Sequence, residues 1–220
     1  MKSCSYSIHA ILLIVFCLSG NIFAQGESLP MRISLFGGMV FPQGDFGTNS
    51  MDKGGYAKTD FGGMIEMSKR LKGKARWVTS ISLDANKLDV SAMESQSGNI
   101  HITGGSYTTI WAMTGIGLET SSASNIKVYI IVQGGMLISS VPDISYYAEN
   151  VPIKQTTALG NAFAFGFGGG VIINKINFGL RCYTGEPEYE QTVTYGRYSH
   201  TAKDEMRTTV LQLMIGINFL

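Results

Sequence analysis

Residues 211–219, Leu-Gln-Leu-Met-Ile-Gly-Ile-Asn-Phe, decide the fold class of this 220-residue chain. Every odd-numbered position from Leu211 to Phe219 is apolar, whereas the positions between them include Gln212 and Asn218. A period of two places alternate side chains on opposite faces of a strand, and it would scatter the apolar set around a helix. The segment is therefore predicted to be a strand with one apolar face.

The same alternation recurs along the chain, for example where Phe178 and Leu180 alternate with Gly179 and Arg181. It predicts eight strands, at about 31–41, 56–70, 75–90, 105–120, 126–140, 158–174, 176–186 and 206–219. Long connections alternate with short ones, and both chain ends fall on the short-turn side. An even number of strands with this alternation is the layout of bacterial outer-membrane barrels.

The beginning of the chain predicts export. Lys2 supplies a positive charge, residues 10–18 form a short apolar run, and Ala24 is a small residue at the expected cleavage site. We therefore predict a signal peptide at 1–24 and a β-barrel domain at 25–220. A lipoprotein anchored at Cys17 is the alternative, although Phe16 stands where small residues normally precede a lipid-modified cysteine.

The composition of the mature chain excludes several classes of protein. Only Cys182 remains after cleavage, so no disulfide within the chain is expected. Removal of Lys2 leaves 16 basic and 16 acidic residues, and this balance gives no reason to expect a nucleic-acid partner. The glycine-rich stretch 166–170 is followed by no helical pattern, so it is not a dinucleotide-binding fingerprint, and no cofactor is predicted.

The second face of the strands separates a membrane barrel from a secreted soluble one. Opposite Phe163, Phe165 and Phe167 the chain carries only alanine and glycine. Small residues suit the narrow lumen of an eight-stranded barrel, and large apolar residues suit contact with lipid. The fold class predicted is thus an all-β, eight-stranded, antiparallel up-and-down transmembrane barrel in the outer membrane.

Charged and aromatic residues are distributed as this topology requires. The long loops carry most of the acidic residues, and aromatic residues near strand ends are expected to form interfacial girdles. The basic residues gather at the short turns: Lys69, Arg70, Lys72, Lys74, Arg76, Lys127 and Lys175. The proposed girdle residues are Phe41, Tyr56, Trp77, Tyr107 and Phe219.

Several segments of the chain share a recognisable pattern, namely residues 42–46 (Pro-Gln-Gly-Asp-Phe), 54–57 (Gly-Gly-Tyr-Ala), 163–170, 176–183 and 185–189. In these segments the chain resembles the outer membrane protein β-barrel domain family, also labelled PorT-like. The resemblance covers roughly the whole mature chain and implies an antiparallel barrel in the outer membrane of a Gram-negative bacterium. Its label also hints at an accessory role in a secretion or envelope-assembly complex. The chain ends in Phe219-Leu220, where many such barrels end in an aromatic residue.

Four charged residues are predicted to face the lumen: Arg32, Glu66, Asp84 and Arg181. The interior of an eight-stranded barrel is filled by side chains, and unpaired buried charges cost free energy. We therefore expect a plug-like polar network that stabilises the barrel. A gated ion path is the functional alternative.

Catalysis and metal binding find little support in the sequence. Ser199-His200 with Asp204 and Glu205 is the best candidate for nucleophilic chemistry on lipid A, but both His101 and His200 fall in predicted loops. These four residues are better explained as polar side chains on a solvated loop. Residues Glu186, Glu188 and Glu190 alternate on one face and could offer oxygen ligands to Ca²⁺, but without a further ligand they form a poor site. We predict neither an enzyme nor a metal site.

The predicted loops carry the remaining candidates for binding, namely Tyr146, Tyr147, Tyr195 and Tyr198. Tyrosine is common at recognition surfaces. Packing of these rings within the loops is the alternative. The sequence favours a monomeric barrel with a structural or adhesive role, in contact with outer-membrane lipid and lipopolysaccharide and assembled by the barrel-assembly machinery. The alternatives are an accessory component of an envelope complex, a lipid A-modifying enzyme and a small-solute pore.

Overall fold

The computed structural model describes residues 31–50, 54–71, 73–97, 100–120, 125–148 and 151–219. The predicted signal peptide at 1–24 and Lys72 lie outside the described residues.

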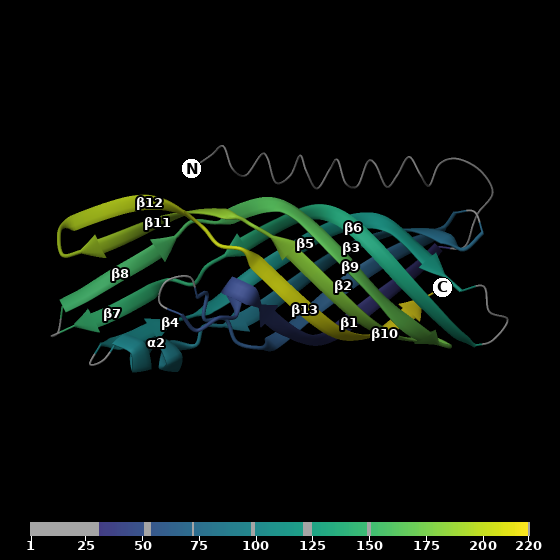
Figure 1. Cartoon of the computed structure of the whole chain (residues 1–220), viewed down its shortest axis with the longest axis horizontal. Coiled ribbons are helices and arrows are strands. Elements are labelled where there is room, and N and C mark those ends of the chain that lie inside the picture. Colours follow the sequence, from purple (N-terminus) through teal and green to yellow (C-terminus); the bar gives the residue numbers. More distant parts are fainter. Residues whose placement is uncertain are drawn as a thin grey trace. The chain divides into compact units, whose positions relative to one another are not determined.

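Eight long antiparallel strands form a closed barrel (Figure 1). The sheet closes because β13 pairs with β1 on one side and with β10 on the other. This confirms the predicted eight-stranded architecture. The barrel strands are β1 (Met31–Gln43), β2 (Asp60–Arg70), β3 (Ala75–Lys87), β5 (Ser106–Glu119), β6 (Ile126–Ser140), β9 (Gly160–Ile173), β10 (Ile176–Gly185) and β13 (Thr208–Phe219).

Two predicted strand ends differ most from the structure, both on the long-loop side. β2 begins at Asp60 and not at Tyr56, because Tyr56 has a positive φ of 51° that ends the extended chain. β3 ends at Lys87, and helix α2 (Val90–Ser97) follows it. Asp89 caps this helix by accepting a hydrogen bond from the Ala92 amide at 3.0 Å. Neither α2 nor the short helix η1 (Gly44–Phe46) is long and apolar enough to cross a membrane.

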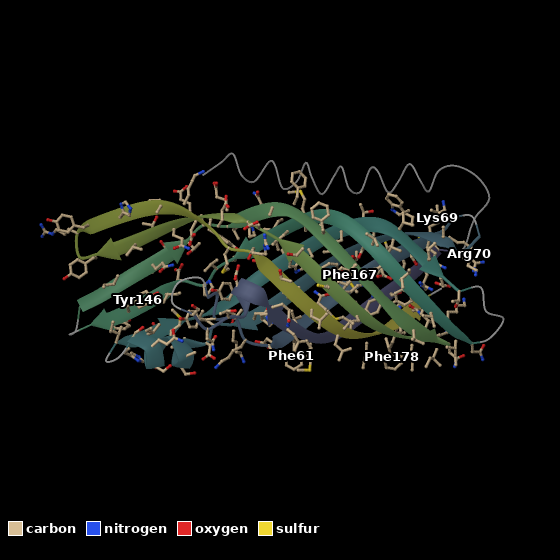
Figure 2. All side chains as sticks on the ribbon, in the orientation of Figure 1. Phe61, Lys69, Arg70, Tyr146, Phe167 and Phe178 are labelled. Atoms are coloured by element: carbon tan, nitrogen blue, oxygen red, sulfur yellow. The ribbon has the colours of Figure 1, made fainter. Side chains whose placement is uncertain are left out.

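The barrel wall is apolar outside and mainly polar inside. Phe165 and Phe167 of β9 are 68% and 65% exposed, whereas Gln133 and Arg181 are buried inside the barrel. Figure 2 shows Phe61 and Phe178 projecting away from the barrel wall. The large side chains therefore point outward along the alternation that the sequence displays.

The lumen holds large rings as well as the small residues and ions that we predicted. Trp111, Tyr129 and Tyr183 are all buried inside the barrel. Their bulk fits because glycines lie beside them: a Cβ on Gly166 would collide with the Tyr183 ring, and one on Gly170 would collide with Tyr129 and the Phe178 carbonyl. The glycines of β9 thus make room for aromatic rings from neighbouring strands.

The long connections were predicted to be loops, but the described parts of three of them contain strands that form a further sheet beyond the barrel. We call this sheet the extension. Its strands pair in the order β12-β11-β8-β7-β4, and β11 joins it to the barrel through the pair Glu188 and Asn161 of β9. Figure 1 shows it standing beyond one end of the barrel. The extension contains β4 (His101–Gly104), β7 (Ile144–Ala148), β8 (Val151–Thr157), β11 (Glu188–Tyr195) and β12 (Tyr198–Glu205).

A hydrophobic core closes the barrel where the extension meets it. Tyr56 and Tyr107, which we had assigned to an interfacial girdle, are buried in this core, and the Phe46 and Tyr107 rings meet edge to face at 5.1 Å. The Tyr107 hydroxyl donates to the Gly55 carbonyl at 2.6 Å. The girdle assignment of these two tyrosines was therefore wrong, because their rings are buried between the long connections and the barrel mouth.

The close contact between β5 and β6 at Gly115 provides a test of the strand packing in the barrel wall. A Cβ at Gly115 would collide with the Val132 carbonyl oxygen, and this backbone atom cannot move without disturbing the pairing of β5 with β6. We expect Gly115→Ala to lower the free energy of unfolding by about 1–3 kcal/mol. Gly37→Ala is the control, because no atom lies within 4 Å of a Cβ there. Urea unfolding in lipid vesicles measures both, and equal stability of the two variants would contradict the assigned packing.

Candidate functional site

The four lumen residues predicted from the sequence all lie inside the barrel, but at three separate places. At the first, the Arg181 Nη2 donates to Glu66 Oε2 at 2.8 Å, with both side chains buried. The same nitrogen donates to the Tyr129 hydroxyl at 3.1 Å, and this hydroxyl donates in turn to Asn177 Oδ1. The guanidinium carbon lies 5.2 Å from the centre of the Tyr129 ring.

Asp84 lies apart from this ion pair and is held by neutral donors. Its Oδ2 accepts hydrogen bonds from Trp111 Nε1 at 3.0 Å and from Gln212 Nε2 at 2.7 Å. Its Oδ1 accepts from the Ser82 hydroxyl at 3.0 Å. Strands β2, β6 and β10 contribute to the network around Glu66, and strands β3, β5 and β13 contribute to the network around Asp84, so six of the eight barrel strands are tied through the lumen.

Arg32 lies at the short-turn end of the lumen, where its partner is a residue that we did not predict. Arg32 Nη1 donates to Glu119 Oε2 at 2.8 Å, and Arg76 and Lys127 approach the same carboxylate at 3.5 and 3.6 Å. Glu119 has the inward parity of Trp111 and Met113 on β5, and that parity could have identified it. The space between Arg32, Arg76 and Glu119 is about 10 Å³, roughly the room that one water molecule needs.

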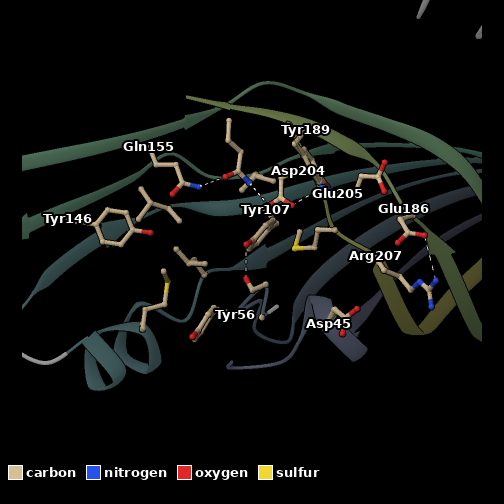
Figure 3. A pocket seen from close by; sticks show the side chains of 18 residues that line it. Asp45, Tyr56, Tyr107, Tyr146, Gln155, Glu186, Tyr189, Asp204, Glu205 and Arg207 are labelled. Carbon is tan, nitrogen blue, oxygen red and sulfur yellow. Dashed lines mark hydrogen bonds and ion pairs between the residues drawn. The ribbon is translucent and has the colours of Figure 1, made fainter. Parts of the chain in front are cut away.

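A larger cavity of about 520 Å³ lies between the barrel mouth and the extension. Figure 3 shows Tyr107 and Tyr189 inside it, with the ion pair between Glu186 and Arg207 at its edge. The Gln155 amide donates to Gln191, and the Gln191 amide donates to Asp204. The carboxylates that line the cavity outnumber the cations: Asp45, Glu186, Asp204 and Glu205 against Arg207.

The candidate tyrosines in the extension fall on two faces. Cross-strand pairing places Tyr146 beside Ile153, Ile153 beside Tyr195, and Tyr195 beside Tyr198. Directly opposite residues of antiparallel strands share a face, so these four residues form one row, which we call the tyrosine row. Tyr147 follows Tyr146 on β7 and therefore lies on the other face, where its ring lies 6.0 Å from the ring of His101.

The tyrosine row leads from the core to solvent. Beyond Tyr146 the row meets Ile102, which is 1% exposed, whereas Tyr195 and Tyr198 are 52% and 81% exposed at the β11–β12 hairpin. Tyr146 also lines the cavity, so the cavity and the row are continuous. Burial, with a smaller contribution from Tyr56, raises the pKa of Tyr146, and its hydroxyl is therefore protonated and able to donate.

The structure does not bring the candidate catalytic or metal-binding residues together. Ser199 and His200 are successive residues of β12 and point to opposite faces, although both were expected in a loop. Glu186 pairs with Arg207, and Glu188 pairs with Lys203. Within the described ranges, no three His, Cys, Asp or Glu side chains are placed to hold a metal ion.

The solved structures that this chain resembles include outer-membrane proteins. The outer membrane protein OprG from Pseudomonas aeruginosa is 8% identical over 87% of this chain and 97% of its own, with a TM-score of 0.54. The fold is that of the small outer-membrane barrels. The attachment invasion locus protein Ail of Yersinia pestis is 11% identical over 86% of this chain and 97% of its own, with a TM-score of 0.46.

No family model matches the sequence, and no curated protein matches it. The resemblance to the PorT-like family therefore stays a prediction.

The Glu66–Arg181 pair can be tested by removing one or both partners. Glu66→Ala would leave the Arg181 charge buried without its carboxylate, and we expect the free energy of unfolding to fall by about 3–5 kcal/mol. Combining Glu66→Leu with Arg181→Met should recover most of that loss. Lys203→Ala, which breaks an exposed pair, should cost less than about 1 kcal/mol. A Glu66→Ala variant as stable as the unmodified protein, in urea unfolding from lipid vesicles, would contradict the assigned role.

Proposed function

We propose that this protein is a monomeric outer-membrane barrel of a Gram-negative bacterium that binds a ligand at the cell surface through its extension. The observation that carries the proposal is the tyrosine row, which leaves the core and ends in exposed rings on a sheet beyond the apolar wall. Exposed tyrosines on a rigid sheet offer a large contact area at a low cost in side-chain entropy.

The apolar belt supports the membrane placement. Leu213, Ile215 and Ile217 are each more than half exposed on the outer surface of β13. Water would disfavour such a continuous apolar surface, whereas hydrocarbon accepts it. The short turns then face the periplasm, and the extension stands outside the cell, as in other bacterial barrels with long external connections.

The cavity suggests the character of the ligand. Its excess of carboxylates favours a partner that carries positive charge, and the half-buried ring of Tyr146 offers a face to apolar or cationic groups. Because Tyr146 lies in both the cavity and the tyrosine row, one extended ligand could contact both.

The other functions predicted from the sequence receive less support. A pore is disfavoured because Arg181 hydrogen-bonds inside the lumen to both Glu66 and Tyr129. A lipid A-modifying enzyme is disfavoured because Ser199 and His200 point to opposite faces. An accessory role in an envelope complex would use the same exposed row, with a protein of the cell envelope as its ligand.

The surface-binding role predicts adhesion that depends on the tyrosine row. We would display the protein on a non-adherent laboratory strain and measure cell retention on surfaces coated with mucin, collagen or fibronectin. Combining Tyr195→Ser with Tyr198→Ser should lower retention about tenfold or more, since aromatic hot spots each contribute about 1–2 kcal/mol.

Tyr147→Ser is the matched control, because Tyr147 is also exposed but lies on the opposite face of β7. It should retain most of the adhesion. Retention no greater than that of cells without the protein, on all three coatings, would count against an adhesive role. An equal loss in the Tyr147→Ser variant would count against the tyrosine row.

A further inference from the structure

The end of the barrel opposite the extension carries an excess of positive charge. Among the described residues, the strand ends and turns there contain only one acidic side chain, that of Glu119. Figure 2 shows Lys69 and Arg70 at this end. The basic residues near it are Arg32, Lys69, Arg70, Lys74, Arg76, Lys127 and Lys175.

Glu119 neutralises only part of this charge. Arg32, Arg76 and Lys127 all lie within 4 Å of its carboxylate. Arg70, Lys74 and Lys175 form no ion pair with any described residue. We call these three residues the turn cations.

Strand register adds an independent indication of an anion. Arg70 is the direct cross-strand partner of Arg76 at the end of the β2–β3 ladder. Like charges in directly opposite positions destabilise a sheet. Glu119 lies beside Arg76, but no described carboxylate lies beside Arg70. An external anion next to Arg70 would offset this repulsion.

Two of the turn cations, Lys74 and Lys175, are also placed where lipid headgroups would lie. Lys175 is the exposed turn residue directly before Ile176, whose side chain is 47% exposed on the outer wall. Lys74 is exposed in the β2–β3 turn, close in sequence to the half-buried Trp77. Headgroup phosphates lie just beyond the hydrocarbon that such apolar residues contact. Lysine and arginine bind phosphate through charge-assisted hydrogen bonds.

We propose that the turn cations bind the phosphate groups of anionic phospholipids. The basic side chains come from separate turns around the barrel, Lys74 between β2 and β3 and Lys175 between β9 and β10. That distribution fits a ring of lipids better than a single protein patch. The inference rests on the proposed placement in a membrane.

The test compares the lipids that surround the full chain in mixed vesicles of phosphatidylcholine and phosphatidylglycerol. Spin-labelled forms of the two lipids measure the preference of the protein for one over the other. We expect the unmodified protein to prefer phosphatidylglycerol. Combining Arg70→Gln, Lys74→Gln and Lys175→Gln should reduce this preference about fivefold or more, since each basic group near an anionic surface contributes about 1 kcal/mol.

The control removes the same charge from the opposite end, by combining Lys58→Gln, Lys154→Gln and Arg197→Gln. This variant should keep the preference for phosphatidylglycerol. Heat-modifiable migration on gels would first show that each variant is folded.

The outcomes separate the two proposals. Failure of the unmodified chain to insert into vesicles would contradict the membrane placement itself. Insertion without a preference for phosphatidylglycerol would overturn the lipid inference alone and would favour an acidic protein segment as the partner of the turn cations. An equal loss in the control variant would also overturn it.

Discussion

The requirement that every backbone hydrogen bond be made within the wall governs this structure. Hydrocarbon offers no partner to a free N–H or C=O group, so a sheet can cross a membrane only if it has no open edge. The pairing of β13 with both β1 and β10 supplies that closure. Once the sheet is closed, the period of two sends Leu213 and Ile215 outward and Gln212 and Met214 inward. The contrast between wall and lumen follows from this one constraint.

A closed eight-stranded wall leaves an interior that must be filled and neutralised. Glycines of β9 and rings such as Tyr183 interlock, which resembles the packing of a soluble core. The buried acidic side chains are stabilised in two different ways. Glu66 pairs with Arg181, and Asp84 accepts hydrogen bonds from neutral donors. A filled lumen gives the extension a firm base. The pairing of β11 with β8 and β12 then carries the sheet away from the mouth.

The sequence predicts the barrel well because both faces of each strand have distinct environments. In the segment from Leu211 to Phe219, the apolar residues at odd positions indicate a face toward lipid, and the residues between them indicate a face toward the packed lumen. Tyr56 departs from this pattern because a positive φ, which periodicity does not reveal, ends the strand. Strand β12 of the extension escaped prediction because its residues are exposed on both faces and carry no apolar alternation. Asp89, which caps α2, was a local sequence signal for this helix, but the period-two analysis did not use it.

The candidate sites were predictable to different degrees. Parity alone placed Arg32, Glu66, Asp84 and Arg181 in the lumen, but it could not say which charges meet, because pairing depends on the stagger between distant strands. Glu119 was missed although its inward parity on β5 could have identified it as a lumen residue. The tyrosine row depends on the register of β7, β8, β11 and β12, and this register cannot be inferred from the sequence of each segment alone. The division between Tyr146 and Tyr147 follows once β7 is known to be a strand.

Tryptophan fluorescence in vesicles whose lipids carry brominated acyl chains tests the orientation of the wall most directly. The chain has two tryptophans, and Trp77→Phe would leave only Trp111, which is fully buried in the lumen. A second variant would combine Trp77→Phe, Trp111→Phe and Phe167→Trp, placing the reporter on the outer wall. We expect bromine to quench the reporter at position 167 strongly and Trp111 hardly at all. Equal quenching of the two, or none at position 167, would contradict a barrel with its apolar face toward lipid.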